Sequence, residues 1–111
     1  MEEITRGDSI NLVVTLATNG EVKEFQQGDI VKAGMKKFID ATNTYLLFKE
    51  IEIQDVCDGV QVIFLPEETK DLPLGNAVFE VELTYNNGAS KKTIFEENVF
   101  VKGDVIQWVI F

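Results

Sequence analysis

Apolar and polar residues alternate most regularly from Ala77 to Tyr85, directly after a corner at Leu72–Asn76 that contains a proline and a glycine. Side chains of a β-strand point alternately to opposite faces of the sheet. One face of this segment is therefore apolar and consists of Ala77, Phe79, Val81, Leu83 and Tyr85. The pattern predicts a strand that lays one face on a hydrophobic core.

The same alternation predicts strands in several other segments. Ile10–Leu16 has an apolar residue at every second position, and in Val60–Leu65 we expect Val60, Val62 and Phe64 to point inward. Ile30–Ile39 also alternates. A helix over Ala33–Ala41 is the alternative there, but a glycine and several β-branched residues favour a strand.

The segment Thr44–Ile53 alternates less simply, because its apolar positions change face midway. A β-bulge or bend near Lys49 would produce that change, and so would two short strands. Pro66–Asp71 is polar and predicts a connection that can include one helical turn.

Turn-forming residues separate these segments. We expect turns at Thr18–Gly20, Gln26–Asp29 and Asn86–Gly88, and Asp58-Gly59 is a typical hairpin dipeptide. After the Asn86–Gly88 turn, the return strand Lys91–Glu97 should pair antiparallel with the preceding strand and continue to Val101.

Short strands with turn signals every 8 to 12 residues or so are typical of an antiparallel sandwich. We therefore expect one all-β domain over residues 1–111, with about seven strands. The predicted core consists of Leu12, Val14, Leu16, Val31, Ala33, Val60, Val62, Phe64, Phe79, Val81 and Leu83.

Composition argues against several functions. A net charge of −9 repels phosphate backbones and anionic lipids, so we expect neither nucleic acid nor membrane as a partner. The chain has no histidine, which is the commonest general base and transition-metal ligand. We expect no enzyme activity and no metal, and we expect the single cysteine, Cys57, to be a small buried residue.

Three other groups of residues contain side chains of the types found in binding sites. Arg6-Gly7-Asp8 matches a tripeptide that integrins read, but we expect it to turn the chain, with Asp8 accepting backbone hydrogen bonds. The acidic residues at Glu67–Asp71 and Glu96-Glu97 lack the spacing of a calcium loop, so we expect them to be solvated. The remaining group contains the candidates for a sugar-binding surface, which are Tyr45, Phe48 and Asn43.

The chain ends on an apolar run that includes the candidate interface residues Trp108, Val109, Ile110 and Phe111. This run does not alternate, so a strand there would carry apolar side chains on both faces. Two readings follow. The run is a last strand covered by its own domain, or it docks on a neighbouring subunit, where aromatic residues commonly supply much of the binding energy.

Three features occur together in one order along the chain. Arg6–Ser9 opens an alternating strand, Leu72–Gly75 forms a Leu-Pro-Leu-Gly corner before another, and Asn98–Val101 is followed by Asp104-Val105. In this combination the chain resembles the immunoglobulin-like domains of phage and prophage baseplate proteins, in particular the N-terminal domain of upper baseplate proteins. Phe79 lies in the strand after the corner, so a corner tyrosine is not carried over.

The resemblance implies an immunoglobulin-like antiparallel β-sandwich and a structural or adaptor role in a virion tail or baseplate, with no catalytic residues and no cofactor. The implied partners are other virion proteins and further copies of the chain. Met1–Arg6 lacks the apolar segment of a secretory signal. We therefore expect synthesis in the bacterial cytoplasm without a signal peptide, followed by incorporation into the virion. The alternative is a bacterial immunoglobulin-like surface or carbohydrate-binding module.

Overall fold

The computed structural model describes residues 2–37 and 45–103. Its elements are, in order, β1 (Glu2–Thr5), β2 (Ile10–Val14), β3 (Leu16–Thr18), β4 (Glu21–Lys23), β5 (Ile30–Lys36), β6 (Tyr45–Glu52), β7 (Val60–Phe64), α1 (Pro66–Thr69), β8 (Gly75–Tyr85) and β9 (Ser90–Lys102). In this part of the chain, no helix is long and apolar enough to cross a membrane.

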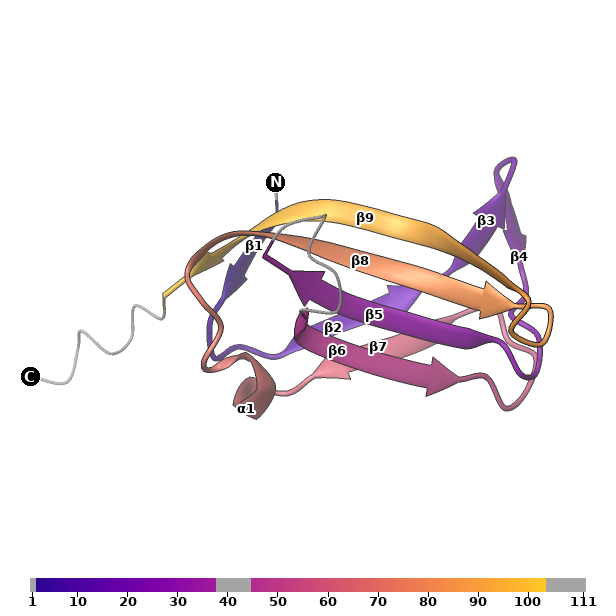
Figure 1. Ribbon diagram of the computed structural model, residues 1–111, viewed down its shortest axis with the longest axis horizontal. Helices are drawn as coiled ribbons and strands as arrows, with labels where there is room; N and C mark the ends of the chain where they lie inside the picture. The colour runs from indigo at the N-terminus through magenta and orange to yellow at the C-terminus, as the bar shows by residue number, and fades with distance from the viewer. Residues whose placement is uncertain (1, 38–44, 104–111) are drawn as a thin grey trace, which may run out of the picture.

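The strands form two layers of unequal width. The wide layer is a five-stranded sheet in the order β1-β9-β8-β5-β6, and the narrow layer consists of β2 and β7 alone. Figure 1 shows β2 and β7 behind the wide sheet, while the β3–β4 hairpin stands out from the body. The prediction of an all-β sandwich is confirmed.

The core lies between the two layers and agrees with most of the predicted set. Nine of the eleven predicted core residues are buried, whereas Leu12 and Leu16 are only partly buried and pack at its margin. The predicted set does not include the buried residues Phe25, Met35, Leu47, Ile53, Leu72, Ala77, Val99 and Val101, although alternation had placed Ala77 on the apolar face of its strand.

The strand count and one strand direction differ from the prediction. Nine strands are described instead of about seven, and β1 pairs in parallel with the end of β9, Glu2 opposite Val99. The predicted strand Ile10–Leu16 is divided at Thr15, where the chain leaves β2 and enters the β3–β4 hairpin. The acidic start had given no sign of a strand because β1 has only a few half-buried positions to mark its face.

The predicted change of face near Lys49 is wrong. In β6 the residues Leu47, Lys49 and Ile51 lie on the more buried side, Ile53 directly after the strand is buried, and Phe48 is exposed. The irregularity lies earlier, because Met35 pairs with Leu47 but Lys36 pairs with Tyr45, which leaves Leu46 as an extra residue. Lys49 and Phe48 made the face seem to switch because a lysine points inward and a phenylalanine points outward.

The hairpin interpretation of Asp58-Gly59 is also wrong. These residues lead from β6 in the wide sheet to β7 in the narrow one, and β7 pairs with β2. Just before them, Cys57 is half-buried and forms an isolated antiparallel bridge with Phe25. At this point the chain therefore passes from one layer to the other instead of forming a hairpin within one sheet.

The other turns and the short helix are confirmed. Asn19, Asn86 and Asn87 have positive φ angles, as do the glycines that follow in both turns. The Asn86 turn joins β8 and β9 as an antiparallel pair. One helical turn, α1, begins at Pro66. Ile30–Lys36 forms the strand β5, as predicted, and not the alternative helix.

Gly34 lets an aromatic ring lie directly on the outer face of the wide sheet. A Cβ built at Gly34 would lie 2.6 Å from Cδ1 of Tyr45 and 2.9 Å from the carbonyl oxygen of Leu47. Contacts this short exclude any side chain unless Tyr45 moves. Gly34 therefore determines where the ring of Tyr45 is placed.

The variant Gly34→Ala is expected to lower the free energy of unfolding by about 2 kcal/mol, because the added methyl group displaces Tyr45. Urea denaturation followed by circular dichroism measures the change. Gly103→Ala is the matched control, since a Cβ at Gly103 meets nothing within 4 Å. Equal stabilities for the two variants would contradict the packing role of Gly34.

Candidate functional site

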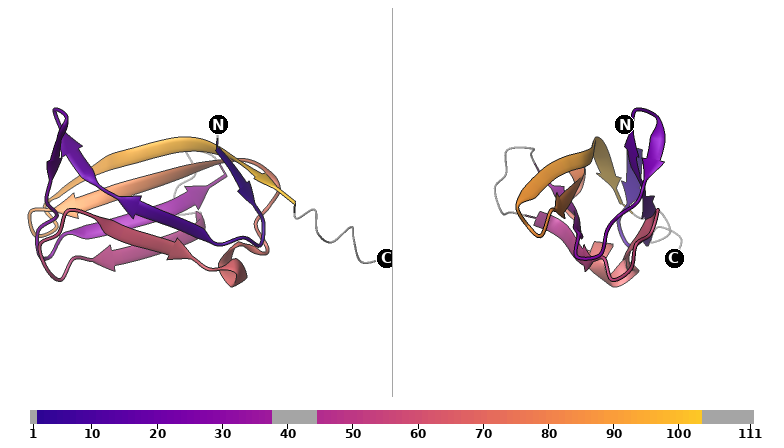
Figure 2. Two further views of the ribbon diagram at one scale, coloured as in Figure 1. Left: turned by 180° about the vertical axis from the view of Figure 1, so that it is seen from behind. Right: turned by 90° about the vertical axis from the view of Figure 1, so that its right-hand side faces the viewer.

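An apolar groove runs along the side of the sandwich bordered by β2 and β9. It consists of two adjoining hollows of about 410 and 300 Å³ that share Leu12 and Phe95 in their linings. Other apolar residues of the groove are Ile4, Ile10, Val14, Phe79, Val81, Ile94 and Val99. The left view of Figure 2 shows β2 from the side of the narrow layer, with β9 beyond it.

The groove exists because both bordering strands have a free edge within the described residues. On one side, β2 pairs with β7 and with no other described strand. On the other, β1 covers only the last part of β9, from Val99 to Lys102. The remainder of β9, Ser90–Asn98, has β8 on one side and no described strand on the other.

Phe95 lies at the side of the wide sheet that the two-stranded layer does not fully cover. It pairs with Val81, so both side chains lie on the inner face of the wide sheet. Val81 is 1% exposed, yet Phe95 is 46% exposed. An inward-facing phenylalanine remains half open to solvent because β2 does not reach across it.

A bulge at the neighbouring residue directs Phe95 inward. Val81 pairs with Phe95, but Glu82 pairs with Thr93, which leaves Ile94 as the extra residue in β9. The bulge shifts the alternation by one position, so Phe95, Glu97 and Val99 follow one another on the inner face. Without it, Phe95 would point to the outer face of the sheet.

The rim of the groove is acidic. Glu2, Glu3, Asp8 and Glu97 line its larger hollow, and neither hollow has a lysine or arginine among its described lining residues, although Glu3 forms an ion pair of 3.1 Å with Lys102. The rim therefore repels acidic segments, while the floor offers apolar surface to an uncharged one. The arrangement suits an extended, apolar peptide segment better than a charged small molecule.

The opposite side of the sandwich, between β6 and β7, is closed by an ion pair. The ammonium group of Lys49 lies 3.0 Å from Glu68 in α1 and 5.8 Å from the centre of the Phe64 ring. The backbone N–H of Leu65 also donates to Glu68 at 3.0 Å. This backbone bond, and after it Lys49, lowers the pKa of Glu68 below its ordinary value of 4.5.

A second polar cluster lies on the outer face of the wide sheet. The ammonium group of Lys36 is 2.8 Å from Oε1 of Glu80, and both side chains are largely buried, at 13% and 10% exposure. The Tyr45 hydroxyl donates to the same oxygen at 3.5 Å, and the Lys36 ammonium lies 4.9 Å from the ring centre. The hydrogen bond to Glu80 raises the pKa of Lys36 above 10.5, although burial opposes it.

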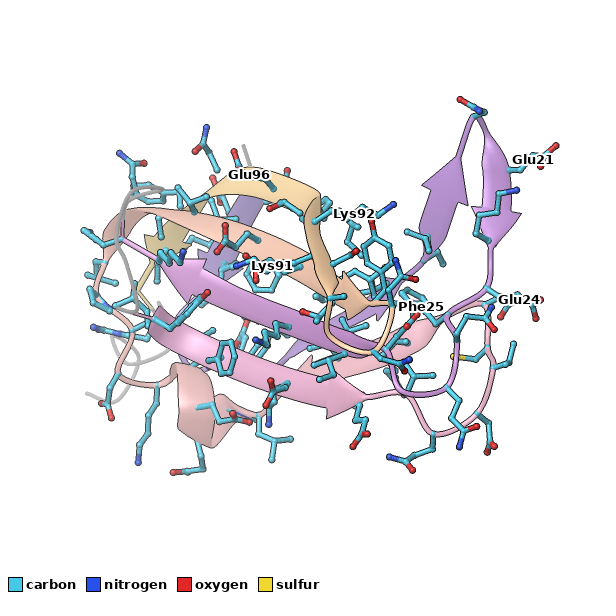
Figure 3. The ribbon with its side chains drawn as sticks, turned by 45° about the vertical axis from the view of Figure 1, so that its right-hand side comes forward. Glu21, Glu24, Phe25, Lys91, Lys92 and Glu96 are labelled. Atoms are coloured by element: carbon cyan, nitrogen blue, oxygen red, sulfur yellow. The ribbon has the colours of Figure 1, made fainter. Side chains whose placement is uncertain are left out.

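A third hollow, of about 300 Å³, lies at the end of the sandwich near the β8–β9 turn. Figure 3 shows Phe25 inside this end and Glu24 directed outward, with Lys92 on β9 above them. The carboxylate of Asp29 accepts the backbone N–H of Gln26 at 3.0 Å. Asp29 thus stabilises the turn in which it lies. The ammonium group of Lys92 lies 5.6 Å from the centre of the Tyr85 ring.

The residues singled out in the sequence have different outcomes. Gly7 turns the chain with a φ of 91°, as expected. Asp8 takes part through its backbone: its N–H donates to Thr5, and its carbonyl accepts the Thr69 hydroxyl at 2.7 Å. In the ranges 2–37 and 45–103, no three His, Cys, Asp or Glu side chains are placed to hold a metal ion.

The structure brings together two of the three sugar-binding candidates. The ring centres of Tyr45 and Phe48 are 4.8 Å apart at an angle of 43°. Tyr45 is already in contact with Gly34, Lys36 and Glu80, however, so its ring serves the outer polar cluster. Asn43 and the candidate interface Trp108 to Phe111 lie outside the described residues.

The groove itself was missed in the sequence. Phe95 was assigned to a return strand, but alternation in Lys91–Glu97 is interrupted by the bulge at Ile94, which has no signature in the residue types. The exposure of Phe95 depends on how far the opposite layer, β2 and β7, extends over it. No pattern within β9 could have revealed it.

In comparisons with known proteins, no family model, no curated protein and no solved structure matches the chain. The resemblance to baseplate domains therefore rests on the sequence motifs described above.

The variant Lys36→Met is expected to lower the free energy of unfolding by about 2 to 3 kcal/mol, because it leaves the largely buried Glu80 without its counter-charge. Lys32→Met is the control, since the ion pair of Lys32 with Glu50 is longer, at 3.7 Å, and more exposed. We expect it to cost less than about 1 kcal/mol. Urea denaturation of both variants measures the difference.

The effect of Lys36→Met should also depend on pH. The folded-state pKa of Lys36 is raised, so its stabilising effect is complete below the ordinary value of 10.5 and is lost as the pH rises through the folded-state value. The difference in stability between wild type and Lys36→Met should therefore shrink in strongly alkaline solution. A difference that stays constant there would show that Lys36 stabilises the fold by packing alone.

Proposed function

We propose that this chain is a non-enzymatic structural or adaptor protein of a phage or prophage virion, at the tail or baseplate, and that it acts by binding protein segments in the β2–β9 groove. The observation that carries the binding role is Phe95, which faces inward and is nevertheless half exposed. The virion setting is supported by the sequence resemblance. An immunoglobulin-like sandwich is part of the same proposal.

Strand addition is the mode of binding that fits the groove. A free strand edge presents unpaired backbone N–H and C=O groups, which an extended segment can pair with. A strand added to β2 would widen the narrow layer from two strands to three. Its inward side chains would then cover Phe95 and Leu12, which line both hollows.

Both sources of binding energy are present in this arrangement. Backbone pairing supplies affinity with little dependence on sequence, whereas the two hollows select apolar side chains at alternate positions. The acidic rim at Glu2, Asp8 and Glu97 acts against acidic segments. The expected partners are thus other virion proteins, or further copies of the chain, that offer an uncharged extended segment.

Incorporation into particles tests this proposal. When the prophage that encodes the chain is induced, quantitative mass spectrometry should find the wild-type chain in purified particles at a fixed ratio to the tail proteins. Phe95→Glu should reduce that amount at least tenfold, because a carboxylate in the apolar groove disfavours binding.

Phe100→Glu is the matched control. Phe100 lies on the same strand and is similarly exposed, at 39%, but it lines neither hollow. This variant should enter particles like the wild type. Absence of the wild-type chain from particles would overturn the virion role, and equal incorporation of both variants would overturn the groove as its binding site.

A further inference from the structure

We propose that the segment bound in the groove is the apolar run Val105–Phe111 of a second copy of this chain. The inference rests on the proposed function, since it names the occupant of the same groove. It turns the open side of the sandwich into the site of self-assembly. Each copy would supply one groove and one run.

The composition of the run matches the groove. Val105–Phe111 has no charged residue, and Gln107 is its only polar residue. The chain as a whole carries a net charge of −9, so most of its other segments would be repelled by the acidic rim and by a second copy. An uncharged apolar strand is the part of this chain best suited to approach the groove of another copy.

The length of the run is also suitable. Seven residues in an extended conformation span about 23 Å, and the five residues of β2 span about 17 Å. The run can therefore lie along the whole free edge of β2 and still leave residues at its ends. Apolar side chains on both of its faces allow one set to enter the hollows while the other remains on the outside of the narrow layer.

The position at which the chain leaves the sandwich favours a second copy over the same chain. The last residue of β9, Lys102, accepts the backbone N–H of Arg6 at 2.9 Å. From there the chain turns through Asp8 and Ser9, which line the larger hollow, and enters β2. The turn is fixed to α1 by the 2.7 Å hydrogen bond from Thr69 to the carbonyl of Asp8.

To enter its own groove, the run would have to reverse direction after Lys102 and pass the anchored turn that leads into β2. The run of a second copy meets no such obstacle on the open side between β2 and β9. Reciprocal exchange between two copies would give a closed dimer, and one-way donation would give a larger ring or filament.

Trp108 provides a direct reporter, because it is the only tryptophan of the chain. In the full-length protein we expect light scattering to show an oligomer and Trp108 emission to be blue-shifted, as for a buried indole. On dilution the oligomer should dissociate, and the emission should shift to the red over the same concentration range.

Two variants connect this signal to the groove. Phe95→Glu should weaken self-association at least tenfold and leave Trp108 emission red-shifted, whereas Phe100→Glu should behave as the wild type. Deleting Ile106–Phe111 should give a monomer. Circular dichroism is measured for each protein, so that a variant that unfolds is replaced by the milder Phe95→Thr.

Three results would overturn the inference. They are a monomer whose blue-shifted Trp108 emission is independent of concentration, an oligomer that survives the deletion, and self-association that Phe95→Glu leaves unchanged. A monomeric chain that enters particles in a Phe95-dependent manner would overturn this inference alone. A self-associating chain that is absent from particles would instead overturn the virion role.

Discussion

The structure depends on one constraint, which is that the apolar inner face of a five-stranded sheet must be covered by a layer of only two strands. β2 and β7 form the second layer, and the buried residues of the wide sheet include Val31, Met35, Phe79 and Val81. Within the described residues the two layers are not hydrogen-bonded to each other at either margin, between β2 and β9 or between β6 and β7. The way in which each margin is covered determines which apolar side chains are exposed to solvent.

The two margins are treated differently. Between β6 and β7, an inward-facing lysine reaches Glu68 of α1 and covers the ring of Phe64, so a charged pair takes the place of a missing strand. Between β2 and β9, the ion pair of Lys102 with Glu3 lies at one end of the groove and does not cover Phe95, an inward-facing phenylalanine that remains half exposed. A long free strand edge beside apolar surface is a hazard for unintended pairing unless it has an intended partner.

The polar groups elsewhere serve the fold. On the outer face, Lys36 and Tyr45 both contact one carboxylate oxygen of Glu80, and Gly34 provides the space for the tyrosine ring. Asp29 and Asp8 each stabilise a turn. Once these groups are accounted for, the β2–β9 groove is the surface whose chemistry most resembles a binding site, and its apolar floor favours a protein segment as ligand.

The sequence by itself determined the local structure wherever periodicity and turn chemistry act over a few residues. The strand β8, the inward faces of β5 and β7, the Asn-Gly turns and the single helical turn follow from residue types alone. Tertiary structure decided what depends on neighbours distant in sequence. The parallel pairing of β1, the crossing at Asp58-Gly59, the bulge at Ile94 and the half-open Phe95 all depend on which strand lies opposite, and alternation within one strand carries no information about its partner.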